Sequence, residues 1–413
     1  MNTIQEILHE SRTTFDLKSS ENQDHLYSIA EALMDSSTNL DELHTQVKDS
    51  VTRLEFRMAY HLMSSLKAML SIDRPVKVAV VFAMWGEQNR LRPYSAENPH
   101  GEDTLRTKVK QLDWITKGTD VTWKLYAVDD GCPHDSGAMA MEIAESIGEQ
   151  GRVEVLFLEK ALPQSEGPLK NLNSANESRK GGAIIYGAQR AMEDGFDAVI
   201  YTDADNSVHL GQIGLLLQPY ALQNFPVVIG NRKDALSVLV KQENRWGVGI
   251  KVLRHMQRMI GRTIFDLGIR DTQAAFILYD KSILKEILKA PSVYDFSFDS
   301  DWIAASIVMK APIHKVAFAF VDSFEESASI VQGPMTTWET LLFGLLESVR
   351  KRELDYDEDM ASVMQEHVDG VPDLERIINL LPAQLEKASD AQLGDPTVMS
   401  PAKLAEWFKE IKG

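Results

Sequence analysis

The chain has 413 residues, which is too long for one small domain and indicates one large domain with appendages, or two to three domains. Its hydrophobic fraction of 44% can supply a full core, and 25% charged residues is ordinary for a globular protein. The formal net charge of −18 argues against a nucleic-acid-binding or anionic-membrane-binding surface, because both require a cationic face.

The cysteine content and the N-terminal sequence indicate a cellular compartment. Cys132 is the only cysteine, so no intramolecular disulfide can form and a reducing environment is favoured. Residues 1–6 lack the basic and apolar regions of a signal peptide, and no run approaches the roughly 18 apolar residues that span a bilayer. We therefore expect a cytoplasmic protein without an integral membrane segment.

Residues 1–72 show helical periodicity and no convincing strand. Leu26, Ile29 and Leu33, and further on Leu54, Met58 and Leu62, recur at steps of three and four residues. The pattern predicts a helical N-terminal region whose apolar face packs on the core or, as the alternative, forms an oligomerisation surface.

Strand-like runs alternate with helical patterns across residues 73–335. The runs are 76–83, 121–128, 153–158, 198–202, 227–230, 274–279 and 313–320, and helices fit between them at 104–117, 138–148, 182–194 and 282–288. This alternation predicts an α/β domain built on a mostly parallel, Rossmann-like sheet flanked by helices.

Residues 336–413 return to a helical pattern. Helices are expected over 337–351, within 360–382 and over 401–411, with an acidic, solvated linker at 353–359 between them. This C-terminal helical region offers a second surface through which the chain could form homo-oligomers.

Two carboxylates follow the buried run at 198–202. Asp203 and Asp205 are separated by one alanine, at the point where that strand would end. Ligands in open α/β sheets bind beyond the carboxyl ends of strands, and paired carboxylates there can hold a hard divalent cation. A helix cap or an acidic turn is the structural alternative.

Other strand ends carry polar groups as well. Asp129 and Asp130 end the run at 121–128, where a carboxylate can accept from a base N–H or a ribose hydroxyl. Lys180 and Gly181 open the helix at 182–194, where glycine permits close backbone approach and the helix start favours anions.

A basic stretch lies downstream of the carboxylate pair. Arg232 ends the run at 227–230, and cations recur in a helical register at Arg245, Lys251, Arg254, Arg258 and Arg262. Such a series forms either a solvated helix face or a phosphate-binding surface on the donor or acceptor.

Two further acidic segments follow. Asp271 and Gln273 precede the run at 274–279, and Asp299 and Asp301 lie among aromatic residues before a helix. An apolar setting raises the pKa of a carboxyl group and suits a general base, whereas helix capping by Asp299 is the structural alternative.

In this order the motifs resemble those of inverting glycosyltransferases of family 2, which have the GT-A fold, and in particular the dolichyl-phosphate mannose/glucose synthase branch. The similarity covers about residues 76–330. It is carried by the segments VDDG, KGGA, DGFDAVIYTDAD, GNR, RDTQAAF and FDSD.

The resemblance implies a role for each matched residue. It assigns Asp129 and Asp130 to the nucleobase and ribose, and Lys180 with Gly181 to the nucleotide side of the donor. It makes Asp203 and Asp205 the metal ligands. By the same comparison, Arg232 lies near a phosphate, Asp271 and Gln273 line the sugar or acceptor region, and Asp299 or Asp301 is the general base.

The function implied is transfer of a hexose from a UDP- or GDP-sugar to a hydroxyl or phosphate acceptor, with Mg²⁺ or Mn²⁺ as cofactor. The acceptor is a small molecule or a lipid phosphate. The alternatives are a sugar-1-phosphate nucleotidyltransferase and a non-catalytic scaffold with the same fold. The nucleotidyltransferase would need a Gly-rich basic loop after the first strand, which residues 84–92 do not supply.

Overall fold

The computed structural model describes residues 3–36, 40–49, 51–241, 247–322 and 333–412. Its centre is a seven-stranded sheet of order β3-β2-β1-β4-β7-β5-β8. In this sheet β7 runs antiparallel to β4 and β5, and the other pairings are parallel, so the predicted mostly parallel sheet is confirmed. The strands are β1 (Val76–Met84), β2 (Val121–Asp129), β3 (Val153–Phe157), β4 (Ala198–Thr202), β5 (Val227–Gly230), β7 (Phe276–Asp280) and β8 (Ile313–Val316).

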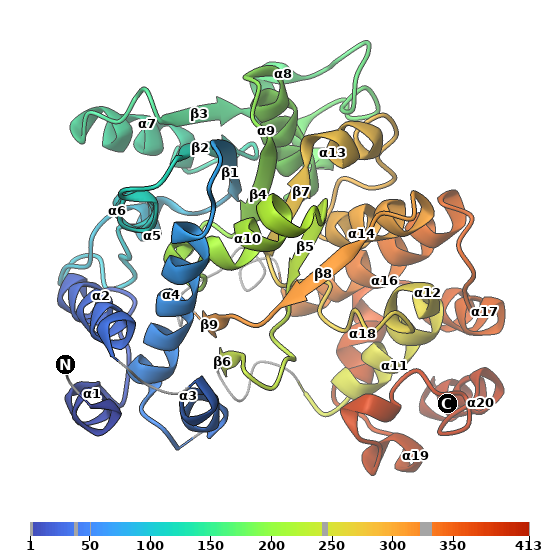
Figure 1. Cartoon of the computed structure of the whole chain (residues 1–413). Helices are drawn as coiled ribbons and strands as arrows, with labels where there is room; N and C mark the ends of the chain where they lie inside the picture. The colour runs from blue at the N-terminus through green and yellow to red at the C-terminus, as the bar shows by residue number, and fades with distance from the viewer. Residues whose placement is uncertain (1–2, 37–39, 50, 242–246, 323–332, 413) are drawn as a thin grey trace.

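The strands have apolar side chains on both faces because helices cover both faces (Figure 1). Along β1, Val78 and Val80 enter one buried cluster, whereas Ala79 and Val81 enter the cluster on the opposite face. One face carries α6 (Thr104–Thr116), α7 (Ser136–Ser146) and α10 (Gly214–Gln223), and the other carries α9 (Gly181–Glu193) and α13 (Lys281–Ile287).

Residues 4–70 form four helices beside the sheet. They are α1 (Ile4–Glu10), α2 (Ser20–Asp35), α3 (Leu40–Lys48) and α4 (Leu54–Leu70). Helix α4 packs on α10, and the apolar side chains of this region share a cluster with a small parallel sheet of β6 (Val238–Val240) and β9 (Ala319–Val321).

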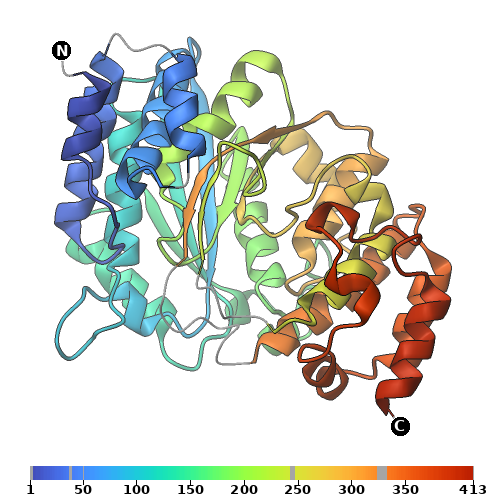
Figure 2. The ribbon, with the colours of Figure 1, turned by 90° about the horizontal axis from the view of Figure 1, so that it is seen from below.

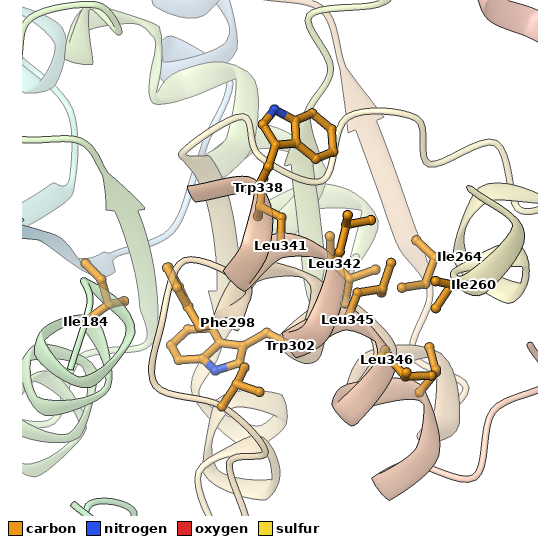
Figure 3. Close-up of a cluster of buried hydrophobic side chains, with 14 of the residues drawn as sticks. Ile184, Ile260, Ile264, Phe298, Trp302, Trp338, Leu341, Leu342, Leu345 and Leu346 are labelled. Carbon is orange, nitrogen blue, oxygen red and sulfur yellow. The ribbon is translucent and has the colours of Figure 1, made fainter. Parts of the chain in front are cut away.

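The C-terminal helices share the core of the sheet domain. They are α16 (Pro334–Lys351), α17 (Glu358–His367), α18 (Val371–Ile377), α19 (Ala383–Glu386) and α20 (Pro401–Lys412). Helix α16 packs on α14 (Phe298–Val308) and α11 (Ile250–Ile260). Figure 3 shows Trp302 of α14 beside Leu342 and Leu345 of α16. The N- and C-terminal helices lie on opposite sides of the sheet (Figures 1 and 2).

Short elements make up the rest of the described secondary structure. They are α5 (Gln88–Leu91), α8 (Leu158–Ala161), α12 (Arg262–Phe265) and three 3₁₀ turns at Ala175–Glu177, Leu210–Gln212 and Asp390–Gln392. Within the described residues, no helix combines the length and apolar character needed to cross a bilayer.

Two sequence predictions were wrong in detail. The run 313–320 is divided between β8 and β9, because the chain leaves β5 after Val316 and pairs with β6 in the small sheet. The strand β6 was not predicted, since three residues give too little alternation to be distinguished from a loop.

Candidate active site

The Asp203–Ala204–Asp205 turn begins where β4 ends, at the carboxyl edge of the sheet. The Oδ1 atom of Asp205 accepts a hydrogen bond of 3.0 Å from the amide of Ser207, which fixes the turn. Asp203 and Asp205 are both half-buried. The motif therefore lies at the sheet edge where α/β proteins bind ligands.

Lys180 connects three elements at this edge. Its amide donates to Asp130 Oδ2 at 2.7 Å, and its ammonium donates to Asp203 Oδ1. Its φ of 75° is a strained conformation for a residue with a side chain. Although burial would raise the pKa of Asp203, the ammonium of Lys180 holds it below its usual value. Lys180 thus ties the start of α9 to the ends of β2 and β4.

The two aspartates after β2 have different roles. Both oxygens of Asp129 accept backbone hydrogen bonds in its own turn, from Cys132 at 2.9 Å and from Gly137 at 2.8 Å. In contrast, Asp130 Oδ1 is buried and accepts no backbone hydrogen bond, and the hydroxyl of Ser178 lies close to this carboxylate. Desolvation raises the pKa of Asp130 to about 7. Of the pair, Asp130 is the one with an oxygen available to a ligand.

Gly181 is required by packing within the protein. A Cβ atom there would lie 2.6 Å from the carbonyl carbon of Tyr294 and 2.7 Å from the carbonyl oxygen of Asp295. The Tyr294 carbonyl also accepts the amide of Gly182, at 3.1 Å. The backbone that approaches the glycines is therefore the chain's own 294–295 segment, where close approach of a ligand was expected.

Buried charged residues next to the carboxylate turn hold it in place, and they were not predicted from the sequence. Lys108 of α6 is fully buried, and its ammonium donates to the carbonyl of Asp205. Glu102 accepts the amide of Asn206 at 3.1 Å and lies 3.4 Å from Arg90. A signal was present, since Lys108 occupies a position in the apolar stripe of α6.

Arg232 and Asp271 form a second buried group. The guanidinium pairs with both Asp271 oxygens, at 2.7 and 2.9 Å, and it also donates to the carbonyl of Gln273. Burial alone would lower the pKa of Arg232, but the carboxylates of Asp271, Asp203 and Asp299 raise it. Arg232 therefore lies within the electrostatic reach of the Asp203 turn.

The structure distinguishes Asp299 from Asp301. Asp299 is 2% exposed, and desolvation raises its pKa to about 7 although the neighbouring hydroxyl of Tyr201 lowers it. It occupies the second position of α14, whose N-cap is Ser297, so Asp299 does not cap the helix. Asp301 instead pairs through both oxygens with Arg352, the C-cap residue of helix α16, at 2.9 Å each. Both carboxylate oxygens of Asp301 thus belong to an ion pair within the protein.

The carboxylate turn offers two hard oxygen donors to a divalent cation. Among the described residues no three His, Cys, Asp or Glu side chains gather around one point. Asp203 and Asp205 therefore fit a metal ion whose other ligands come from outside the chain, as in sites completed by substrate phosphates and water.

The residues of the basic series have different surroundings in the structure. The ammonium of Lys251 donates to the carbonyls of residues 385, 386 and 388, and Arg258 pairs with Asp390 at 2.8 Å. Arg262 pairs with Asp355. Arg254 lines a cavity beside Arg232, and Arg245 lies outside the described residues.

No protein-family model matches the chain. A curated undecaprenyl-phosphate mannosyltransferase from Micrococcus luteus is 24% identical over 181 residues, which are 41% of this chain and 72% of that protein.

Solved structures with a related fold include two synthases. Glucosyl-3-phosphoglycerate synthase from Mycobacterium tuberculosis, in complex with Mn²⁺, UDP-glucose and phosphoglyceric acid, matches with a TM-score of 0.45 and 13% identity, over 71% of this chain and 84% of that one. Mannosyl-3-phosphoglycerate synthase from Rubrobacter xylanophilus matches with a TM-score of 0.45 and 12% identity, over 70% and 78%. With TM-scores below 0.5, these two likenesses add nothing to the argument from sheet topology.

The predicted resemblance is confirmed by the sequence match to a mannosyltransferase. The carboxylate turn after β4 stands at the edge of the sheet where that resemblance requires it. The mostly parallel sheet agrees with the expected GT-A fold, and the chain is similar in sequence to a glycosyltransferase.

Proposed function

We propose that the protein transfers a hexose from a UDP- or GDP-sugar to a hydroxyl or phosphate acceptor, with inversion at the anomeric carbon and with dependence on Mg²⁺ or Mn²⁺. The observation that carries this proposal is the carboxylate turn of Asp203 and Asp205 at the end of β4, linked through Lys180 to Asp130. The groups proposed to bind the donor and the metal ion thereby share one edge of the sheet.

Asp130 is the proposed contact to the nucleoside. Its buried Oδ1 atom accepts no backbone hydrogen bond, the hydroxyl of Ser178 lies beside the carboxylate, and a further donor from a ligand would stabilise its charged form. A base N–H or a ribose hydroxyl is such a donor. Asp129 holds the turn that presents Asp130.

Asp203 and Asp205 are the proposed metal ligands, and Lys180 is the proposed cation beside the diphosphate. A bound divalent cation supplies charge neutralisation to the leaving nucleoside diphosphate. Lys180 orients Asp203 and adds a positive charge at the same place.

Asp299 is the proposed general base for a hydroxyl acceptor. Its pKa of about 7 places it near the working pH of a base, and burial is the largest cause of that value. Asp299 accepts the hydroxyl proton as the acceptor oxygen bonds to the anomeric carbon and the diphosphate leaves. A phosphate acceptor carries no such proton and needs no base.

Isothermal titration calorimetry with UDP-glucose, UDP-galactose, GDP-mannose and ADP-glucose, with and without Mn²⁺, tests the donor site. We expect Mn²⁺-dependent binding of one nucleotide class, and loss of that binding in Asp205→Ala. The matched control is Asp359→Ala, which removes an exposed carboxylate from α17. Absence of binding by all four, with folded protein and Mn²⁺ present, would refute the donor site and favour the scaffold alternative.

A further inference from the structure

A cavity of about 610 Å³ lies between the N-terminal region and the segment that joins α5 to α6. Its lining comes from residues 16–23, which lead into α2, and from residues 93–107, which lead into α6. The volume falls within the range of about 300–1,000 Å³ that is typical of small-molecule sites. This cavity shares no lining residue with the cavity beside Arg232, so the two are separate features.

The charges around this N-terminal cavity are balanced. Three of its four carboxylates have an arginine within ion-pair distance, and Lys18 lines the cavity beside the fourth, Asp16, whose Oδ1 atom accepts the Lys18 amide at 2.9 Å. The three pairs are Glu21 with Arg12 at 2.7 Å, Asp103 with Arg106 at 2.7 Å and Glu102 with Arg90 at 3.4 Å. Balanced charge favours a neutral ligand over a metal ion, a polyamine or a phosphate.

The polar lining offers hydrogen-bond donors and acceptors together. The carboxylates of Glu21 and Asp103 are acceptors with lone pairs beyond those used by their arginines, and the hydroxyl groups of Ser20 and Thr107 can both donate and accept. A ligand hydroxyl also donates one hydrogen bond and accepts others, so it can use both kinds of partner. The lining therefore suits a ligand that carries several hydroxyl groups.

Gln23 places a buried donor in this lining. Its side chain is 4% exposed, and its Oε1 atom accepts a long hydrogen bond of 3.5 Å from Gln111. Its Nε2 atom is buried and has no hydrogen-bond partner among the described residues. Because a buried donor without an acceptor costs free energy, an oxygen of a bound ligand would stabilise this amide.

Tyr94 supplies an apolar surface at the same cavity. It is 58% exposed and lines the cavity together with Pro93 and Leu17. The ammonium of Lys18 lies 5.3 Å from the centroid of the Tyr94 ring and donates to the carbonyl of Pro99 at 3.0 Å, which ties this segment to the N-terminal region. A sugar ring has a face of C–H groups inside its rim of hydroxyls, and an exposed aromatic ring offers that face a contact surface.

We propose that the N-terminal cavity binds a neutral carbohydrate. In this arrangement the sugar hydroxyls bond to Gln23 and to the carboxylates of Glu21 and Asp103, while a C–H face of the sugar lies on Tyr94. The inference goes beyond the proposed function and does not depend on it, since neither a nucleotide nor a metal ion takes part.

Glu102 connects this cavity to the Asp205 turn. Its side chain lines the cavity, and its Oε2 atom accepts the amide of Asn206 at 3.1 Å. Its carbonyl also accepts the side-chain amide of Asn206, at 3.0 Å. A carbohydrate in contact with Glu102 should therefore change the affinity of the Asp205 turn for its ligands, and by reciprocity those ligands should change the affinity for the carbohydrate.

Saturation-transfer difference NMR with glucose, mannose, maltotriose and spermidine, in the absence of nucleotide and metal ion, tests the inference. We expect at least one of the sugars to bind the wild-type protein and spermidine not to bind. Gln23→Leu and Tyr94→Ala should each weaken sugar binding about fivefold or more, because one removes a hydrogen-bond donor and the other removes the apolar surface. The matched control is Leu70→Ala, which removes an apolar side chain of similar exposure, 55%, outside the cavity and should leave the affinity unchanged.

The outcomes that would overturn the carbohydrate site are specific. Failure of all three sugars to bind would do so, and so would binding of spermidine in their place, which would indicate a cation site. Unchanged sugar binding in Tyr94→Ala would place the sugar elsewhere on the protein. This variant changes an exposed residue, so that it remains informative even where Gln23→Leu does not fold.

Titration with the nucleotide sugar and Mn²⁺, in the presence and absence of the carbohydrate, separates this inference from the proposed function. If the carbohydrate binds and the affinity for the donor is the same in its presence, the coupling through Glu102 is overturned and the carbohydrate site stands. If the carbohydrate binds and no nucleotide sugar does, the proposed function is overturned and the carbohydrate site again stands.

Discussion

Lys108 should contribute more to the unfolding free energy than an exposed lysine with one hydrogen bond does. It is fully buried, its ammonium donates to the carbonyl of Asp205, and the carboxylate of Glu102 contributes to its electrostatic surroundings. Lys108→Met keeps the length and the helix propensity of the side chain but removes the charge. The carbonyl of Asp205 would then lose its buried donor, while Glu102 keeps Arg90 as a neighbouring cation, and the loss costs about 1–3 kcal/mol of unfolding free energy.

Lys110 provides a matched control on the same helix. It is 50% exposed and pairs with Asp24 at 2.5 Å, so that Lys110→Met should cost at most about 1 kcal/mol. Urea unfolding followed by tryptophan fluorescence measures both losses. Because Lys108 fixes the Asp205 turn, Lys108→Met should also weaken Mn²⁺-dependent binding of the nucleotide sugar. Equal losses of stability in the two variants would refute the assigned role of the buried network.

Three further substitutions test individual contacts. Asp299→Asn should abolish transfer to a hydroxyl acceptor. It should also stabilise the fold above pH 7 by about 1–4 kcal/mol. The reason is that the pKa of Asp299 is raised in the folded protein, so that its ionisation lowers the unfolding free energy as pH rises from about 4 to 7. Urea titrations at pH 5 and pH 8 measure the difference. Arg352→Met leaves Asp301 as an unpaired buried charge and should lower the unfolding free energy by about 3–5 kcal/mol, measured in urea. Gly181→Ala forces a Cβ atom against the Tyr294 backbone and should lower the thermal midpoint, with a loss of about 1–3 kcal/mol.

Each of these predictions has an outcome that would contradict it. The role of Asp299 would be contradicted if Asp299→Asn left the turnover of a hydroxyl acceptor unchanged. It would also be contradicted if the variant gained the same unfolding free energy at pH 5 and pH 8. For Arg352→Met the comparison is Arg350→Met, which alters an exposed arginine of the same helix, and equal effects would count against the buried ion pair. An unchanged melting curve for Gly181→Ala would show that the 294–295 segment can move aside.

The sequence allowed the strands and their polar ends to be predicted because both depend on local patterns. Buried runs such as 198–202 are continuous and apolar, and the carboxylates follow them directly. The choice between Asp299 and Asp301 could not be made in this way. It depends on Arg352, which lies 51 residues from Asp301 in the chain and reaches it only when α16 packs on α14.

The contacts of Asp129 and Gly181 could not be predicted from the sequence either. Both residues stand where a ligand contact was expected, and both are occupied by contacts within the chain, in the 131–137 turn and the 294–295 segment. A carboxylate or a glycine at a strand or helix end suits a ligand and a tight turn equally well. Only the partner atoms decide between the two, and these come from distant segments or from turn geometry.

The C-terminal region has a structural part in the chemistry that we propose. The ammonium of Lys251 holds α11 against the carbonyls of residues 385–388, and Asp390 holds Arg258 and Arg254 from the same side. These contacts orient Arg254 and Arg258 but neutralise only part of their charge, because the single carboxylate of Asp390 pairs with both guanidinium groups. Trp338, which lines the cavity beside Arg232, belongs to the same region. Changes in the C-terminal helices should therefore alter the cavity beside Arg232 before they alter donor binding, because Asp130, Lys180 and the Asp203 turn are held by β2, β4 and α9.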